Sequence, residues 1–166
     1  RDTFETGETA ARQIRWQLGR RPRAGARYAV PPMSPGDGFL SFQRAKFKTR
    51  LPRGRLYTAG HMWLREAEDD VWQVGLTRFA LRMLGEPVEL ELEVAPDAEL
   101  ETGQVVGWLE GFKAVTDLFT PLSGRFAGGN GVLDDDLDRV HAAPYDDGWI
   151  FAVRGSPGDD CVDTDG

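Results

Sequence analysis

Short apolar stretches separated by turn residues run along most of the chain, and one of them alternates regularly. Residues 88–94 (VELELEV) place valine or leucine at every second position and glutamate between them. Because successive side chains of a strand point to opposite faces, this period of two predicts a strand with one buried face and one anionic stripe. The buried set is Val88, Leu90, Leu92 and Val94, and the stripe is Glu89, Glu91 and Glu93.

A hairpin and a short helix are predicted just before that strand. LYTAGHMWLREAE (56–68) and VWQVGLT (71–77) read as two strands joined by a turn at Glu68–Asp70. Thr77 then offers a side-chain oxygen of the kind that caps the start of a helix, and RFALRMLG follows it. Gly85 is a typical residue at a helix end, so the predicted helix is short.

Further short strands are predicted in the second half of the chain. APDAELETG (95–103) reads as a turn that leads to the strand VVGWLE (105–110). Pro121 and Gly124 are predicted as turn residues before another strand. GGNGVLDDDLDRVH (128–141) mixes a loop with a short acidic helical turn. The closing segment PYDDGWIFAVRG ends in a strand whose alternating residues are Trp149, Phe151 and Val153.

Strands at this density, punctuated by Gly, Pro and Asp, predict a mainly β fold of the barrel or sandwich kind with a few short helices. We divide the chain into three parts. Residues 1–38 form a basic, Pro/Gly-rich N-terminal extension with one short helix at Glu8–Leu18, residues 39–155 form the β domain, and residues 156–166 form a polar C-terminal tail.

The net charge of −7 over 166 residues conceals two oppositely charged parts. Residues 1–55 hold 13 Arg or Lys and 4 Asp or Glu, a balance of +9, whereas residues 56–166 hold 7 and 23, a balance of −16. Such an asymmetry commonly separates a functional domain from an arm. The arm has several interpretations: a solvated extension, a contact with RNA, a membrane surface or an acidic partner, or docking on the acidic part of the same chain.

Membranes and nucleic acid are not the partners we expect. The longest apolar runs, such as VVGWL, are far too short to span a bilayer. The single cysteine, Cys161, lies in a polar segment and reads as a free thiol. This cysteine usage agrees with a reducing cytosol, so we expect a cytoplasmic protein.

The motifs of common catalytic sites are absent from the sequence. His61 and His141 lie far apart, and neither has a second histidine at the spacing of a metal site. We find no nucleophile elbow, phosphate-binding loop or dinucleotide-binding motif. We therefore expect no catalytic residues and no resident metal, and the chain is not predicted to be a self-sufficient enzyme. A metal-dependent enzyme that uses the two histidines is kept as a minor alternative.

One lysine stands out in the stretch WLEGFKAVTDLFTPLSG (108–124). The chain has three lysines, Lys46, Lys48 and Lys113, and every other basic residue after position 55 is arginine. An arginine stays charged, whereas a lysine amine can lose its proton and be acylated. Apolar segments precede and follow Lys113, so we predict that it lies at a protruding hairpin tip and is a candidate for covalent modification.

The run from about Phe47 to Arg154 resembles the H protein of the glycine cleavage system, a family of lipoyl carriers. The matching stretches occur in the family's order: LYTAGHMWLRE, VWQVGLTRFALRMLGEPVELELE, GQVVGWLEGFKAVTDLFTPLSGRF and PYDDGWIFAVRG. EGFKAVTDLFTPLSG is similar to the family's lipoylation segment, ExVKAxxDLxxPxSG, with Phe112 in place of the usual valine. Biotin carriers normally flank their lysine with methionines, which are absent here.

The resemblance implies a barrel-sandwich hybrid fold and a lipoate group amide-linked to Lys113. It implies that Glu110, Ala114 and Asp117 belong to the lipoylation motif, and that His61 and Met62 border the lipoyl arm. In this family the cofactor performs the chemistry and the protein carries it. The implied partners are a lipoate ligase or lipoyl transferase, glycine decarboxylase, an aminomethyltransferase that takes an aminomethyl group from the arm, and dihydrolipoyl dehydrogenase.

Three features depart from the family pattern. The sequence His61-Met62-Trp63 has methionine where the family has a glutamate that helps to shelter the loaded amine. The basic N-terminal extension is unusual, and the sequence ends in DCVDTDG where the family continues into a helix. These departures leave two alternatives open. One is a divergent H-like lipoate carrier for another pathway, such as sulfur oxidation, and the other is a scaffold or binding module that never carries lipoate.

Overall fold

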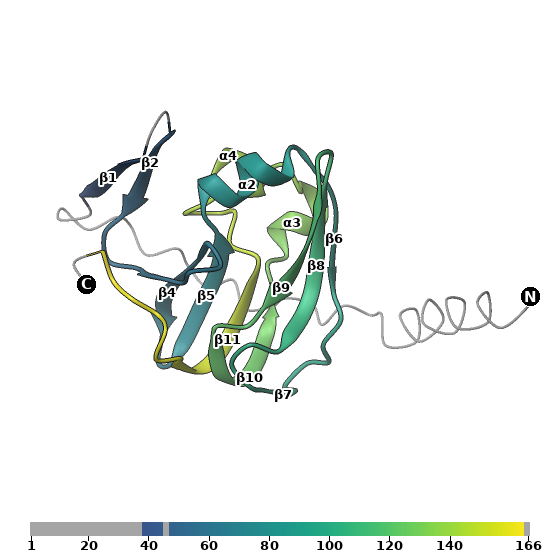
Figure 1. The fold of residues 1–166 in the computed structure, drawn as a ribbon. Helices are drawn as coiled ribbons and strands as arrows, with labels where there is room; N and C mark the ends of the chain where they lie inside the picture. Colours follow the sequence, from purple (N-terminus) through teal and green to yellow (C-terminus); the bar gives the residue numbers. More distant parts are fainter. Residues whose placement is uncertain (1–37, 45–46, 165–166) are drawn as a thin grey trace, which may run out of the picture.

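The computed structural model describes residues 38–44 and 47–164. Most of the predicted N-terminal extension, including the helix predicted at Glu8–Leu18, lies outside these residues. The described residues form three antiparallel sheets (Figure 1). A two-stranded sheet pairs β1 with β2, a six-stranded sheet has the order β3-β4-β5-β11-β10-β7, and a three-stranded sheet has the order β6-β8-β9.

The strands and helices have the following bounds. The strands are β1 (Phe39–Arg44), β2 (Phe47–Pro52), β3 (Leu56–Tyr57), β4 (Met62–Glu68), β5 (Val71–Leu76), β6 (Pro87–Leu92), β7 (Glu99–Leu100), β8 (Val105–Gly111), β9 (Val115–Phe119), β10 (Leu122–Gly129) and β11 (Phe151–Pro157). The helices are α2 (Arg78–Leu84), α3 (Val132–Asp135) and α4 (Arg139–Ala142).

The main core lies between the six-stranded and the three-stranded sheets, which face each other in Figure 1. Leu64 and Val74 enter it from the larger sheet, and Val106, Leu109 and Leu118 enter it from the smaller one. All five are at most 1% exposed. Burial of apolar surface on this scale is the main force that holds two sheets together. The mainly β class predicted from the sequence is confirmed.

The predicted helix is confirmed, and the predicted hairpin is confirmed in part. Residues 56–68, expected to be one strand, are divided by a turn at residues 58–61 into β3 and β4, which pair with each other. Strands β4 and β5 pair as neighbours, and the two residues between them form the turn. Helix α2 begins where expected, because the Thr77 side chain accepts a hydrogen bond from the Ala80 N–H at 3.4 Å. It ends at Gly85, whose φ of 80° lies in the left-handed region that favours glycine.

The predicted burial pattern of residues 88–94 is partly wrong. The strand β6 ends at Leu92, and Val88, expected to be buried, is 50% exposed. The reason is a register shift opposite β8 between Pro87 and Glu89, which turns the Val88 side chain away from the core. Glu91 of the expected exposed stripe is half-buried. Further along, Leu90, Leu92 and Val94 do pack against the core as predicted.

Two turn predictions are also wrong. Residues 95–103, expected to be a turn, contain the short strand β7, which pairs with β10. Gly124, expected to be a turn residue, lies inside β10. A β-carbon at Gly124 would lie 2.0 Å from the carbonyl oxygen of Arg154 on β11, so glycine is needed there for close strand packing rather than for a turn.

The C-terminal part of the described chain belongs to the main sheet. Strand β11 lies between β5 and β10, and it runs across the predicted boundary at residues 155 and 156. It begins at Phe151, and residues 149–153 are buried without alternation, as is usual for a central strand covered on both faces. Beyond it, the backbone of Val162 exchanges two hydrogen bonds with Tyr57, of 2.7 and 2.9 Å.

Tyr57 provides a pH-dependent test of this packing. The residue is 7% exposed, and its hydroxyl donates to the Pro52 carbonyl oxygen at 2.6 Å. Burial, together with the nearby Tyr145, raises the pKa of Tyr57. Below the ordinary tyrosine pKa of about 10, the phenol is neutral in both folded and unfolded chains, and its stabilisation is fully present. Above it the unfolded chain ionises first, so this stabilisation is lost as pH rises.

We expect Tyr57→Phe to lower the free energy of unfolding by about 1 kcal/mol at neutral pH through the lost hydrogen bond. The deficit should shrink above pH of about 10, because phenylalanine has no proton to lose. Denaturant unfolding of both proteins across a pH series measures the difference. A deficit that stays constant with pH would contradict the assignment.

Candidate functional site

Lys113 lies at the tip of the hairpin formed by β8 and β9, as predicted from the spacing of the apolar segments. The Gly111 N–H donates to the Ala114 carbonyl oxygen at 2.9 Å, which leaves Phe112 and Lys113 as the two loop residues. Both side chains are exposed, and Phe112 is 77% exposed. In Figure 1 the tip stands at the end of the molecule where α2 and α4 also lie.

The last residue of α2 and the segment just after the helix hold this tip through main-chain hydrogen bonds. The N–H of Phe112 donates to the Glu86 carbonyl oxygen at 3.0 Å, and the N–H of Lys113 donates to the Leu84 carbonyl oxygen at 2.9 Å. The last carbonyls of a helix have no partner within the helix, so they are ready acceptors. Two-residue hairpin loops usually need positive φ angles, yet neither loop residue has one. The bonds to the helix end therefore stabilise an otherwise uncommon turn.

Two glycines allow the tip and the helix to approach so closely. A β-carbon at Gly111 would lie 2.3 Å from the Leu84 carbonyl oxygen, a distance that side chains do not tolerate. A β-carbon at Gly85 would lie 3.1 Å from Cγ of Lys113. Gly85 was predicted to end the helix, whereas no role was predicted for Gly111. The available signal was a glycine inside a strand pattern, which often marks a close backbone approach.

Helix α2 is itself fixed at both ends. At its start, the Arg78 N–H donates to the Tyr145 hydroxyl at 3.1 Å. At its end, Nε2 of His141, from α4, lies 3.0 Å from the Leu81 carbonyl oxygen and 2.7 Å from the Gly85 carbonyl oxygen. A proton on Nε2 is shared between these two acceptors. His141 therefore helps to anchor the helix end that holds the hairpin tip, a role that the sequence analysis missed.

His61 and Met62, which were expected to border the lipoyl arm, do not lie beside Lys113. His61 is exposed, with a φ of 60°, and its ring lies 4.7 Å from that of Phe79 in the first turn of the helix. Met62 is only 6% exposed and packs in the main core. The two neighbours thus point in different directions, because Met62 begins β4 with its side chain inward. Lys113 lies at the opposite end of a helix about 10 Å long.

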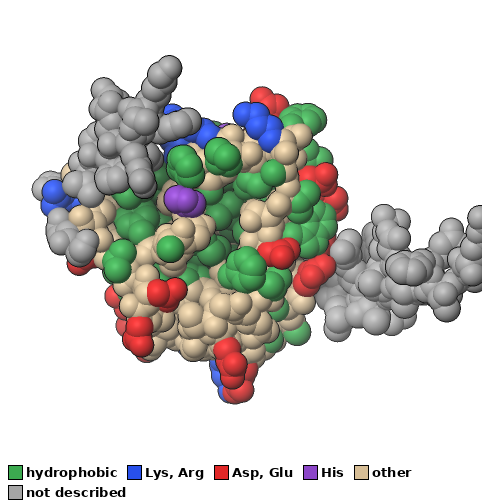
Figure 2. All heavy atoms as spheres, viewed as in Figure 1, with side chains coloured by type: hydrophobic (Ala, Val, Ile, Leu, Met, Phe, Trp, Pro, Cys, Tyr) green, Lys and Arg blue, Asp and Glu red, His purple; other side chains and the backbone are tan. Residues whose placement is uncertain are grey.

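The surroundings of the Lys113 amine leave it available for acylation. Its Nζ lies 3.5 Å from the Arg82 carbonyl oxygen, a contact too long to be a strong hydrogen bond. No described carboxylate forms an ion pair with it. Glu110 is half-buried near the end of β8, Ala114 is exposed beside the lysine, and Asp117 is exposed on β9. Figure 2 shows hydrophobic side chains lining a hollow on the same view of the molecule, with a histidine at its edge.

The described residues contain no group of three His, Cys, Asp or Glu side chains able to hold a metal ion.

Cys161 is half-buried, with Sγ 3.6 Å from the Pro121 carbonyl oxygen. Burial raises the pKa of its thiol, and the neighbouring Asp160 adds to the effect. None of the described helices has the length and apolarity to cross a membrane.

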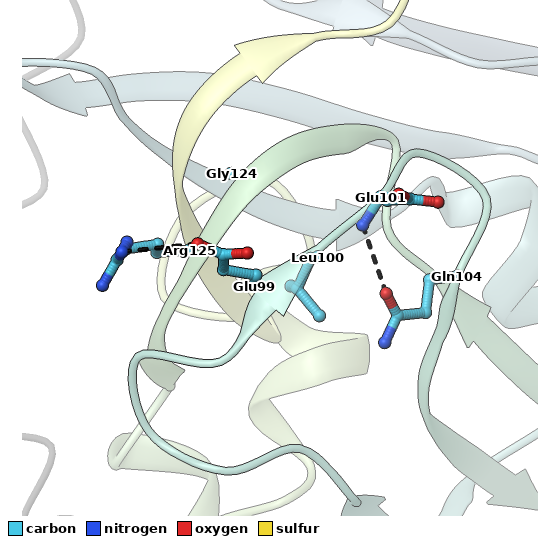
Figure 3. Close-up of a pocket in the computed structure, with 6 residues that line it drawn as sticks. All are labelled: Glu99, Leu100, Glu101, Gln104, Gly124 and Arg125. Atoms are coloured by element: carbon cyan, nitrogen blue, oxygen red, sulfur yellow. Dashed lines mark hydrogen bonds and ion pairs between the residues drawn. The ribbon is translucent and has the colours of Figure 1, made fainter.

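A shallow groove of about 470 Å³ lies away from Lys113, at the end of the molecule where β7 meets β10 (Figure 3). An ion pair of 3.4 Å between Arg125 and Glu99 crosses one side of it, and the Glu101 N–H donates to Oε1 of Gln104 at 3.2 Å on the other. Both interactions are exposed to solvent. The groove thus presents no buried polar group that points to a ligand.

Known proteins match the part of the chain that carries this site. The family model described as glycine cleavage H-protein matches residues 55–161. A glycine cleavage system H protein from Edwardsiella ictaluri is 39% identical over 107 residues, which cover 64% of this chain and 82% of that protein. One from Alteromonas mediterranea is 34% identical over 118 residues, covering 71% of this chain and 88% of that protein.

The chain belongs to the glycine cleavage H-protein family. A crystal structure of a glycine cleavage system H protein from Mycobacterium marinum superimposes with a TM-score of 0.63 at 29% identity, covering 69% of this chain and 94% of that one. The barrel-sandwich fold of the H-protein family, predicted from the motifs, is confirmed. The family match begins at Arg55 and so leaves out the basic part of the chain.

The close approach of tip and helix in this H-protein family member can be tested with Gly111→Ala. We expect a loss of about 1–3 kcal/mol in the free energy of unfolding, because the added methyl group must displace the Leu84 carbonyl oxygen. The Lys113 amide proton, which depends on that carbonyl, should exchange with solvent faster. Gly60→Ala is the control, since its β-carbon would meet only Oγ1 of Thr58 at an ordinary 3.7 Å. Equal effects of the two substitutions on stability and exchange would contradict this account.

Proposed function

We propose that this protein is a lipoyl carrier of the glycine cleavage system and that Lys113 is its lipoyl attachment site. The observation that carries the proposal is the presentation of Lys113. Its side chain is exposed at a two-residue tip, while its backbone is fixed to the end of α2. A modifying enzyme needs an accessible amine, and a carrier needs a firm attachment point. Both requirements are supported by these contacts.

The residues around Lys113 fit an attached lipoyl group. The amine has no described carboxylate partner, so acylation breaks no ion pair among the described residues. A lipoyl group held at Lys113 would supply a disulfide. Its reductive opening would place the aminomethyl group left by glycine decarboxylation on one sulfur and leave the other sulfur as a thiol. The protein's own part is to hold the attachment point and to leave the amine in solvent. Phe112, Met83 and Val115, which are 77%, 61% and 59% exposed, provide apolar surface on the segments that surround the lysine.

The family is a carrier component of a multienzyme system, and we propose the same role here rather than independent catalysis. The proposed partners are a lipoate ligase or lipoyl transferase, glycine decarboxylase, the aminomethyltransferase and dihydrolipoyl dehydrogenase. An arm tethered at Lys113 would meet each partner site at a high effective concentration once the two proteins dock.

Met62 stands where the family has a glutamate, but this difference does not favour a cargo other than the aminomethyl group. The Met62 side chain is buried with Leu64 and Leu76 in the main core, where it contributes to packing. The relatives described above all bear the glycine cleavage name. We therefore place aminomethyl transfer ahead of a divergent pathway such as sulfur oxidation, and ahead of a scaffold that never carries lipoate.

Lipoylation at Lys113 is tested by intact mass. Co-expression with a lipoate ligase and supplied lipoate should add the mass of one lipoyl group to the wild-type chain, and Lys113→Arg should abolish the addition. Lys48→Arg is the matched control, because it removes a different lysine and should leave the addition unchanged. An unmodified wild-type chain under lipoate-replete conditions would refute the carrier function.

The cargo is tested separately with the lipoylated protein. Together with glycine decarboxylase, it should support exchange of the glycine carboxyl carbon with labelled bicarbonate, with a rate that saturates in carrier concentration. The unmodified chain and Lys113→Arg should support only the background rate. A fully lipoylated protein that supports no exchange with a decarboxylase active on another H protein would exclude the glycine cargo while leaving the lipoyl attachment intact.

A further inference from the structure

The outer face of the three-stranded sheet carries apolar side chains that the fold leaves in solvent. The strand registers place Glu89, Glu110 and Val115 in one row, Glu91, Trp108 and Asp117 in the next, and Val105 opposite Phe119 beyond them. The alternate positions, such as Leu109 and Leu118, face the core. We call these eight outward residues the outer face.

Apolar exposure on the outer face is unusually high for one small sheet. Val105, Val115 and Phe119 are 44%, 59% and 46% exposed, and Trp108 between them is only half-buried. Contiguous exposed apolar residues rimmed by polar ones commonly mark an interaction surface. Figure 2 shows hydrophobic and acidic side chains side by side where β6 and β8 lie.

The charge of the outer face limits what can cover it. All of its titratable side chains are carboxylates: Glu89, Glu91, Glu110 and Asp117. Among the described residues, no ion pair neutralises Glu89, Glu110 or Asp117. A partner must therefore be basic and must also offer apolar side chains, because a purely hydrophilic cation would leave the apolar rows in water.

Residues 9–36 have this composition. They contain six arginines and no Asp or Glu, and they also supply Ile14, Trp16, Leu18 and Tyr28. Arginine is well suited to such a surface, because its guanidinium pairs with carboxylates and stacks on aromatic rings. Asp37 alone separates this segment from Gly38, the first described residue. Ten extended residues span about 33 Å, which is enough to reach across a domain of this size.

We propose that residues 9–36 dock on the outer face of the three-stranded sheet. Arginines of the segment pair with Glu89, Glu110 and Asp117, and its apolar side chains cover Trp108, Val115 and Phe119. Tethering favours this occupant over a separate basic protein, because a flexible link raises the local concentration to the order of millimolar. The docked segment lies beside the hairpin tip, since Glu110 and Val115 are within three residues of Lys113. Binding itself does not depend on lipoylation.

Paramagnetic relaxation in the full-length chain tests the docking. A spin label is attached at Ala24→Cys, between Arg23 and Arg27, in a chain in which Cys161→Ser removes the native thiol. At low ionic strength, the amide signals of Trp108, Val115 and Phe119 should lose intensity about twofold or more relative to the reduced label, and signals of β4 should not. In about 1 M salt, where charges are screened beyond about 3 Å, the loss should largely disappear.

Charge-matched variants make the test specific. Glu89→Gln, Glu110→Gln and Asp117→Asn together should restore the intensities, whereas Glu66→Gln, Glu68→Gln and Asp69→Asn, on the β4–β5 hairpin, should not. The proposal is overturned if the outer face shows no loss, if both triple variants behave alike, or if β4 is broadened equally. It is also overturned if the loss appears in a mixture of isotope-labelled and spin-labelled molecules, because that would be binding between chains. The readout needs no lipoate, so it is independent of the proposed function.

Discussion

The site depends on the pairing of two sets of main-chain groups that would otherwise have no partner. The last carbonyls of a helix lack intrahelical donors, and the loop N–H groups of a two-residue hairpin point away from their own strands. Here Leu84, the last residue of α2, accepts from Lys113, and Glu86, two residues beyond the helix, accepts from Phe112. Burying such groups without partners would cost free energy at every one of them. These hydrogen bonds fix the position of the Lys113 backbone.

The larger architecture brings the two elements together. Helix α2 follows β5 of the six-stranded sheet and precedes β6 of the three-stranded sheet, so it crosses from one sheet to the other. The core between the sheets sets their separation, and Leu81 and Leu84 pack the helix against that core. His141 and Tyr145, from the segment between β10 and β11, hold its two ends. The two sheets, helix α2 and the segment between β10 and β11 therefore together determine the orientation of the tip.

Local patterns predicted most of the elements around the site but not their mutual contacts. The β4–β5 hairpin, the Thr77 cap, the end at Gly85 and the tip at Lys113 all depend on residues close together in sequence, and all were predicted. Val88, Gly124 and β7 were not, because a register shift and a strand pairing are decided by distant residues. The motif around Lys113 identified the candidate lysine. The roles of Gly111 and His141 could not be predicted, since each depends on a carbonyl of α2 that is more than 25 positions away in sequence.

The anchoring of the hairpin by backbone atoms has a consequence for the traffic of such a protein between enzymes. The hydrogen bonds that fix the loop join backbone atoms, so lengthening the side chain at position 113 breaks none of them. In the proposed carrier, the unmodified and lipoylated forms would share one scaffold and one set of stabilising bonds. A partner enzyme that distinguishes these forms would have to recognise the group attached to Lys113, because the backbone beneath it would be the same in each.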